Sequence, residues 1–189
     1  MRKSKQEAAE TRQRIVEAAS AEFRRKGIGG TGLADLMAAA GLTHGGFYKH
    51  FDSKDQVVEE SLALAAGSLV DAVESKLSAS SGGRGLHAAI ADYLSIEHRD
   101  NAADGCCFVA LGSELARGSE GVREAATAGF LKLVDVFAGR LDGMSPAAAR
   151  KQALVMLCTI IGALTMARVV TDPQLSSSIL RQARKHLTR

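Results

Sequence analysis

Stop and start signals for helices divide this chain into short helical segments, and they constrain its fold more than any other feature. Two amphipathic stripes are each followed by a glycine, at Gly27 and Gly41, and then by an apolar residue, Ile28 or Leu42. Glycine adopts a left-handed backbone freely, and an apolar residue after it packs back on the last turn in a Schellman stop. The pattern therefore predicts helices over about residues 6–26 and 33–40, each closed by a Schellman motif.

A third short helix follows the second after a very short turn. Thr43 can act as its N-cap, which gives a helix from His44 to about His50. Two helices of about this length joined by a three-residue turn containing glycine have the spacing of a helix-turn-helix. These three segments predict a small helical head.

The remaining helices are also marked by local signals. Residues 53–56 form a capping box, and Ser145-Pro146 and Asp172-Pro173 each pair a capping residue with proline at the first helical position. The apolar periodicity predicts helices over about 53–77, 86–98, 106–117, 122–141, 146–170 and 173–187, with a loop over 78–85. Because almost nothing has the alternation of a strand, we predict an all-α protein with about nine helices.

The positive charge of the chain is concentrated at its beginning. Residues 1–54 carry ten Lys/Arg against six Asp/Glu, a net charge of +4, whereas residues 55–189 carry 14 against 15, a net charge of −1. This asymmetry is typical of a protein whose N-terminal part binds nucleic acid while the rest of the chain does not. The alternative is a basic surface that is simply solvated. We predict a DNA-binding domain over residues 1–54 and a regulatory and dimerisation domain over 55–189.

The sequence predicts a cytoplasmic protein that does not span a membrane. The charged N-terminal residues lack the apolar region of an export signal behind them. The longest uncharged stretch, Gln152 to Ala167, is shorter than the ~20 residues that a membrane span needs. Three cysteines, two of them adjacent, cannot form a disulfide framework and fit a reducing compartment.

The most specific motif is the run A-A-G-L-T-H-G-G-F-Y-K-H-F-D-S-K over residues 39–54. Together with the residues around it, over about 10–60, it closely resembles the DNA-binding signature of the TetR family of transcriptional regulators. The resemblance implies a three-helix DNA-binding head, a helical C-terminal domain that binds a ligand and forms a homodimer, and binding to a palindromic operator in double-stranded DNA. It implies no enzymatic activity, and we expect no cofactor and no metal.

The resemblance also implies individual roles. Contacts with the DNA backbone are expected from Thr31, Thr43, Tyr48 and Lys54, and His44, Gly45, Gly46 and Lys49 are expected to face the bases. The sequence departs from the usual family pattern at Gly32, where Ser or Thr is frequent, and at His44, where Lys is frequent. A solvated surface histidine is the alternative for His44, and a half-buried core aromatic is the alternative for Tyr48.

The glycine pair also has a physical interpretation that is independent of the family. Gly45 and Gly46 remove side chains from the first turn of the third helix, at a cost of roughly 1 kcal/mol each relative to alanine. A backbone without side chains can approach another surface closely. We therefore expect this turn to lie against DNA.

The body is expected to bind a small apolar effector, because apolar residues on its helices have few charges among them. The candidate ligand-binding residues are Phe108, Leu111, Leu115, Phe130, Val134 and Met166, and filling an ordinary core is the alternative for most of them. The helix over 146–170 is apolar on nearly every side, which predicts a homodimer through the last two helices.

Cys106 is the basis of an alternative hypothesis for how DNA binding is regulated. It follows Gly105 at the expected first turn of a helix, where free N–H groups favour a thiolate, so a thiol- or electrophile-sensing regulator is the alternative. Cys158 is expected to be buried, and a metal site among His87, Asp92, His98, Asp104, Cys106 and Cys107 is not favoured because their spacing is irregular.

Two other classes of protein are weighed against the regulator. An all-α cysteine enzyme acting through Cys106 or Cys107 would turn over a thiol substrate, but glycine fingerprints for nucleotides and a G-x-S-x-G elbow are absent from the sequence. A non-specific architectural DNA binder would show no preference between an operator and random DNA.

Overall fold

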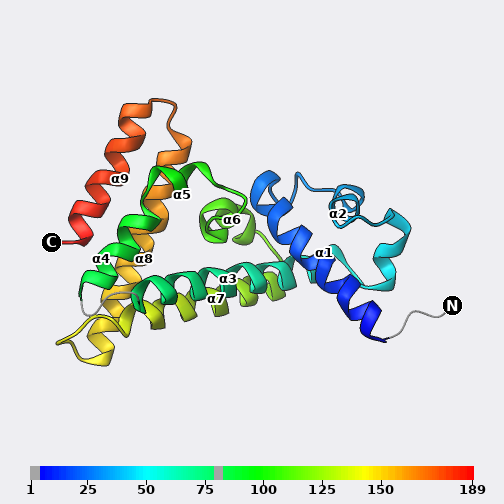
Figure 1. Cartoon of the computed structure of the whole chain (residues 1–189), viewed down its shortest axis with the longest axis horizontal. Helices are drawn as coiled ribbons and strands as arrows, with labels where there is room; N and C mark the ends of the chain where they lie inside the picture. The colour runs from blue at the N-terminus through cyan, green and yellow to red at the C-terminus, as the bar shows by residue number, and fades with distance from the viewer. Residues whose placement is uncertain (1–4, 79–82) are drawn as a thin grey trace.

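The computed structural model describes residues 5–78 and 83–189, and in this part of the chain it contains nine α-helices, one 3₁₀ helix and no strand. The all-α prediction is therefore confirmed. Figure 1 shows a small head at the N-terminal end and a longer body that extends away from it. The predicted loop over 78–85 falls partly on residues 79–82, which lie outside the described residues.

The head consists of α1 (Lys5–Lys26), α2 (Leu33–Ala39) and the 3₁₀ helix η1 (His44–Lys49). The stop after α2 has the predicted Schellman geometry: the Leu42 N–H donates to the Met37 carbonyl (2.8 Å), and Gly41 has a positive φ of 69°. Gly27 also has a positive φ, but its N–H donates to the Phe23 carbonyl in the simpler αL motif. The predicted Schellman stop after α1 is wrong, because Ile28 bonds elsewhere.

The long helix α3 (Lys54–Ser78) joins the head to the body and lies beside α7 (Glu120–Ala138) along its length (Figure 1). The predicted cap opens α3, since Ser53 Oγ accepts from the Gln56 N–H (3.1 Å). The return bond differs from a capping box, because Gln56 Oε1 accepts from the Asp52 N–H (2.9 Å) and not from the N–H of Ser53 itself. A second layer contains α8 (Pro146–Val169) and α9 (Pro173–Leu187), which pack on each other.

The predicted proline starts are confirmed. Ser145 Oγ accepts from the Ala148 N–H (3.3 Å) at the start of α8, and an Asp172 carboxylate oxygen accepts from the Gln174 N–H (2.8 Å) at the start of α9. α8 is long and apolar enough to cross a membrane, and it is the one such helix in residues 5–78 and 83–189. A core helix of a water-soluble protein meets the same criteria, and α8 packs against α6, α7 and α9.

The helix predicted over 86–98 is interrupted. The structure has α4 (Gly83–Tyr93) and α5 (Ile96–Asp100), separated by Leu94 and Ser95. Ser95 caps the second piece, because its Oγ accepts from the His98 N–H (3.0 Å). The break turns α5 toward α8, so that the loop after it can reach the head.

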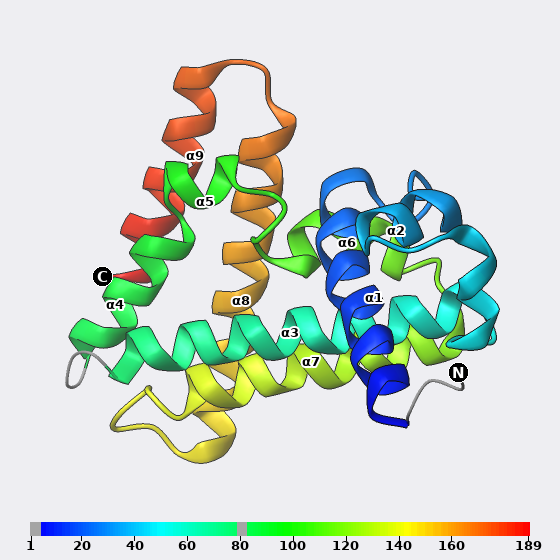
Figure 2. The same ribbon diagram turned by 45° about the vertical axis from the view of Figure 1, so that its right-hand side comes forward.

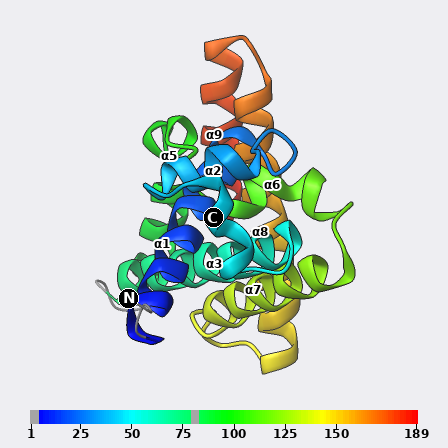
Figure 3. The same cartoon turned by 90° about the vertical axis from the view of Figure 1, so that its right-hand side faces the viewer.

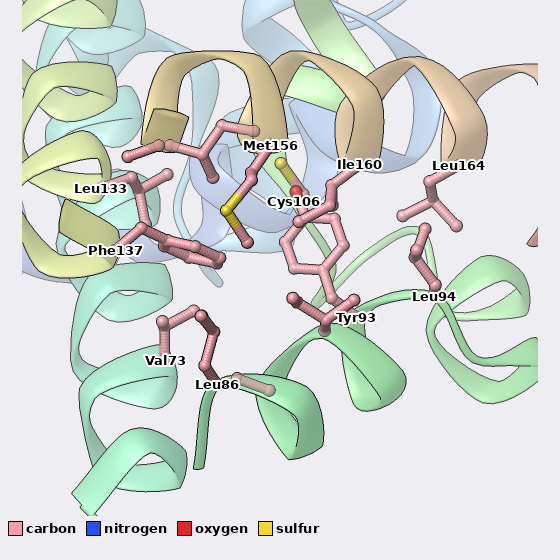
Figure 4. Packing of buried hydrophobic residues seen from close by; sticks show 14 of the residues in the cluster. Val73, Leu86, Tyr93, Leu94, Cys106, Leu133, Phe137, Met156, Ile160 and Leu164 are labelled. Carbon is pink, nitrogen blue, oxygen red and sulfur yellow. The ribbon is translucent and has the colours of Figure 1, made fainter. Parts of the chain in front are cut away.

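Buried residues form two clusters that meet near α6 (Cys107–Leu115). The head cluster contains residues of α1, α2 and η1, and also of α3, α6 and α7. The body cluster joins α3, α4, α7, α8 and α9, and Figure 4 shows its side chains, from Val73 on α3 to Ile160 on α8, pointing toward one another. The division predicted at residue 54 stays a prediction, and apolar packing crosses it.

Candidate nucleic-acid interface

The short helix η1 presents the head's candidate DNA-binding surface. It is a 3₁₀ helix instead of the predicted α-helix. Two successive glycines, Gly45 and Gly46, lower the α-helical propensity of its first turn, and the tighter 3₁₀ turn is common in such short pieces. Thr43 has the extended backbone of an N-cap, but its side chain makes no capping hydrogen bond, contrary to the prediction.

Most of the predicted DNA-contacting residues lie together on the outside of η1. Thr43, His44, Gly45, Tyr48 and Lys49 are exposed, and Gly46 is half-buried. The Tyr48 side chain is 68% exposed, which excludes the alternative of a half-buried core aromatic in the isolated chain. Figure 3 turns the head toward the viewer, with α1 and α2 in front. A duplex could therefore reach the surface without displacing another element.

The glycines of η1 are not required by the fold. A Cβ added to Gly45 would meet no atom within 4 Å, and one added to Gly46 would lie 3.4 Å from the flexible end of Met37. Neither residue has a positive φ. Since neither crowding nor backbone conformation demands glycine here, the bare turn is available for a close approach by another molecule.

Two phenylalanines fix η1 to the head. Phe47 and Phe51 are buried, and their rings stack with centroids 5.7 Å apart. Arg12 of α1 covers this pair: its guanidinium lies 4.0 Å from the Phe51 ring centroid, and it bonds to the His50 carbonyl and to the Glu60 carboxylate. The sequence did not reveal this role of Arg12, because an arginine on a solvent face of a helix has no distinctive pattern. The contact holds η1 between α1 and α3.

Thr31 does not belong to the exposed surface. It is fully buried, and its hydroxyl donates to the Gly27 carbonyl (2.8 Å) in the turn between α1 and α2. The expected contact of its side chain with DNA is therefore wrong. A threonine at a helix start can cap that helix or bond back into the preceding turn, and the packing of α1 on α2 selects the second arrangement.

Lys54 has a structural contact of its own at the base of the head. Its Nζ donates to the Ile28 carbonyl and lies 5.9 Å from the centroid of the Phe23 ring. The Ile28 N–H donates to Glu114 Oε2 of α6 (3.1 Å). The turn after α1 is thus held by Lys54 at the start of α3 and by Glu114 of α6. Because the Ile28 N–H donates to Glu114, it does not form the Schellman hydrogen bond. Figure 2 shows α6 next to the head, beside α1.

The candidate ligand-binding residues are divided between the two clusters and the surface. Leu111 and Leu115 are buried in the head cluster, and Val134 is buried in the body cluster. Phe108 and Phe130 are half-buried, with ring centroids 5.8 Å apart. Met166 is 49% exposed on α8. Leu111, Leu115 and Val134 are thus core residues, as the alternative had it. A ligand-binding role for the six residues stays a prediction.

The position of Cys106 does not favour a thiol sensor. It is the N-cap of α6, fully buried, and burial raises the pKa of its thiol. Burial likewise raises the pKa of Cys107 to about 12. Cys158, expected to be buried, is exposed on α8. A thiol that is protonated and shielded from solvent is a poor nucleophile, so sensing through Cys106 is not supported.

His98, in contrast, has a defined role beside Cys106. Its Nδ1 lies 2.9 Å from the Tyr93 carbonyl, and its Nε2 lies 3.2 Å from the Cys106 backbone nitrogen. Because a carbonyl only accepts, Nδ1 carries the proton and Nε2 accepts from the Cys106 N–H. Burial lowers the pKa of His98 and favours this neutral form. No group of three or more His, Cys, Asp or Glu that could hold a metal lies within residues 5–78 and 83–189.

Comparison with known families covers both parts of the chain. Residues 15–61 match the family described as "Bacterial regulatory proteins, tetR family". Residues 83–186, more than half of the chain, match the family described as "Transcriptional regulator LmrA/YxaF-like, C-terminal domain". The first match contains η1 and its exposed residues.

Relatives match the N-terminal part. The HTH-type transcriptional regulator TtgR of Pseudomonas putida is 44% identical over 59 residues, 31% of this chain and 28% of that protein. The probable acrEF/envCD operon repressor of Escherichia coli is 37% identical over 78 residues, 41% of this chain and 35% of that protein. The matched segment thus spans only about a third of each of these relatives.

Solved structures resemble the whole fold. A TetR transcriptional regulator from Chloroflexus aurantiacus superposes with a TM-score of 0.79 at 24% identity, over 97% of this chain and 94% of the other. Escherichia coli NemR in its reduced form superposes with a TM-score of 0.77 at 20% identity, over 94% and 95% of the two chains. At these identities the likeness concerns the fold alone.

Proposed function

This chain belongs to the TetR family of transcriptional regulators, and on that premise we propose that it is a repressor that binds a two-fold symmetric operator as a homodimer. The family indicates a DNA-binding regulator and not an enzyme. One relative is described as a probable operon repressor, which supports the direction of control. Because such regulators act on DNA, we place the protein in the cytoplasm.

The exposed face of η1 is the observation that carries this proposal. His44, Gly45, Gly46 and Lys49 face the base edges of the major groove, where the missing side chains of the glycines let the backbone approach. Thr43 and Tyr48 contact phosphates through their hydroxyl groups. Lys54 adds a phosphate contact through the N–H donors that its bond to Ile28 leaves free.

The dimer forms through α8 and α9. Large apolar side chains are exposed on the outer side of these helices: Leu154, Val155, Met166 and Val169 on α8, and Leu175 on α9. Several large apolar side chains exposed on one pair of helices are typical of a protein–protein interface, and a two-fold axis would bury the same residues on both subunits. Two heads related by that axis would read two half-sites about one helical turn or somewhat more apart.

A small, largely apolar molecule controls DNA binding. The body has a separate hydrophobic cluster behind the head, and α6 contacts both. A ligand that changes the packing of the body can therefore change the position of the head without touching DNA. This part of the proposal is independent of the operator's sequence.

Selection of bound fragments from a random pool of double-stranded DNA tests the proposal. The purified full chain should enrich a palindrome, and a probe carrying the two half-sites should bind at least about a hundredfold more tightly than random DNA of the same length at equal salt. Enrichment of a site without two-fold symmetry would contradict binding as a homodimer. Equal binding to all fragments would favour a non-specific architectural binder and overturn the regulator of a defined operator.

A further inference from the structure

One segment of the body, residues 98–106 from the last turn of α5 to the start of α6, contacts the head directly. The contact is made by Arg24 in the last turn of α1, whose Nε donates to the Ala103 carbonyl. Asp104 attracts the same guanidinium at longer range, and Arg24 Nη1 also donates to Ser20 Oγ (3.0 Å) on its own helix. Figure 2 shows this connecting segment running from α5 past α8 to α6, next to α1.

The other side of the connecting segment is held by Arg168 of α8. Its Nε donates to the Arg99 carbonyl and its Nη2 donates to the His98 carbonyl, both at 2.8 Å. In the same turn of α8, Met166 and Val169 are exposed on the side proposed to face the partner subunit. One turn of α8 therefore carries both the proposed dimer contact and the hold on the connecting segment.

The connecting segment is folded too tightly to absorb a displacement of either arginine. The Cys106 N–H donates to His98 Nε2 (3.2 Å), which ties the two ends of the segment together. A Cβ added to Gly105 would lie 2.7 Å from the Asn101 carbonyl oxygen and 3.2 Å from Arg168 Nη2, so no side chain fits there. Gly105 does not have a positive φ, and this close approach alone therefore requires glycine. A displacement at one end of the segment should reach the other.

We propose that Arg24 and Arg168 are positioning residues that set the separation of the two heads in the dimer. The head continues into the body through α3, and Arg24 and Glu114 fix its angle from the two ends of α6. Because Arg168 holds the same segment from the proposed dimerisation helix, this angle is set relative to the partner subunit. A two-fold axis repeats the angle in both heads, which fixes the distance between the half-sites they reach. The inference rests on the proposed homodimer and its symmetric operator.

Operators with altered spacing test the proposal by fluorescence anisotropy. The palindrome selected from random DNA is remade with its half-sites about one base pair closer and about one base pair further apart, and a duplex with a single half-site is the reference. The unchanged chain should bind the altered spacings at least about tenfold more weakly, because its heads are held at one separation. Arg24→Met, which removes the donors, should lose less than about threefold on the same probes. Both proteins should bind the single half-site equally, since η1 is unchanged.

Two further variants separate the contact from the charge. Arg25→Met is the matched control, because Arg25 is the next residue on α1, is exposed and pairs with Glu22 (2.8 Å). It should keep the spacing preference of the unchanged chain. Arg24→Lys retains a donor that can reach the Ala103 carbonyl and should restore part of the preference. A preference that persists in Arg24→Met, or that is lost equally in Arg25→Met, would overturn the proposal.

Arg168→Met reaches the same segment without touching the head. It should relax the spacing preference as Arg24→Met does, and a circular dichroism melt checks that each variant folds. The double variant should relax the preference no further than the stronger single variant, because losing either contact already frees the segment. Effects that multiply in the double variant would show that the two arginines act independently, which contradicts a connection through residues 98–106.

A distance measurement without DNA keeps this inference separable from the proposed function. Spin labels at Glu17→Cys on α1 and Lys132→Cys on α7, both exposed, are introduced together with Cys158→Ser, and labelled chains are diluted with unlabelled ones. Arg24→Met and Arg168→Met should each broaden the distribution of distances between head and body, and the control variant should not. An unchanged distribution in both variants overturns the positioning role even if a palindrome is found. Broadening without any selected palindrome leaves the positioning of the head and overturns the repressor.

Discussion

The Glu114 carboxylate on α6 accepts a hydrogen bond from the backbone N–H of Gly29 in the head (2.7 Å), 85 residues earlier in the chain. The other carboxylate oxygen accepts from the Ile28 N–H (3.1 Å). One side chain of the body thus satisfies two amides that the end of α1 leaves open. A movement of α6 along the head would therefore displace the turn between α1 and α2, which precedes η1 in the chain.

Removing this carboxylate should weaken the attachment of the head. Glu114→Ala should lower the free energy of unfolding by about 1–2 kcal/mol, because two bonds to a charged acceptor are lost while the exposed Gly29 amide can bond to water. Urea unfolding followed by circular dichroism measures the change. Glu124→Ala on α7, an exposed glutamate, is the control and should change stability by less than about 0.5 kcal/mol. Equal effects of the two variants would contradict a specific role for Glu114.

Tyr48 and His44 should have different effects on DNA binding. Tyr48→Phe removes only an exposed hydroxyl, so we expect a loss of roughly 1 kcal/mol that is nearly equal on operator and random DNA. His44→Ala should instead reduce the preference for the operator, because it removes a group that we propose to face the bases. Fluorescence anisotropy with both probes at constant salt measures the two ratios. The opposite pattern would reverse the assigned roles.

A substitution at Gly45 should change the affinity for DNA without lowering the free energy of unfolding. Gly45→Ala places a methyl group in open space, so the free energy of unfolding should stay equal or rise by up to about 1 kcal/mol. The same methyl group should hold the backbone away from DNA and weaken operator binding about tenfold or more, since it lies where the closest approach is proposed. Thermal melting and anisotropy on one preparation test both effects. Unchanged operator affinity would remove Gly45 from the interface.

A charge on the outer face of α8 should dissociate the dimer. Val155 is 60% exposed in the single chain, so Val155→Glu should leave the subunit folded while it places an unpaired carboxylate in the interface. Sedimentation velocity should then find monomers where the unchanged chain is a dimer at micromolar concentration. Leu131→Glu, at an exposed leucine on α7, is the matched control and should remain dimeric. A monomeric unchanged chain would contradict the interface.

Stability should fall in mildly acidic solution because of His98. Burial lowers the folded-state pKa of His98 below its ordinary 6.5, so below pH 6.5 the unfolded chain binds a proton that the folded chain does not. The contribution to the free energy of unfolding is constant above pH 6.5 and declines below it, by at most about 1.4 kcal/mol per pH unit, down to the folded pKa. Urea titrations of the unchanged chain and of His98→Gln at pH 7.5 and 5.5 isolate this effect. A difference between them that does not depend on pH would contradict it.

Elements whose signals are local could be predicted from the amino-acid sequence. The Schellman stop at Gly41, the N-cap at Ser53 and the proline starts of α8 and α9 depend on hydrogen bonds between residues two to five positions apart, so neighbouring residues suffice to predict them. The motif over residues 39–54 was sufficient to locate the exposed surface of η1 for the same reason. Ser95 carried a local capping signal that could have predicted the break between α4 and α5.

Tertiary structure alone decided which residues face solvent, a cavity or a distant partner. The periodicity of α8 did not distinguish buried Ile160 from exposed Met166. In a helix that is apolar on every side, the neighbouring helices that pack on it decide which side is buried. Thr31 was turned inward by the packing of α1 on α2, and the Ile28 amide was taken by Glu114. Such contacts join residues far apart in sequence, and their geometry is set by how whole helices pack and not by the residues beside them.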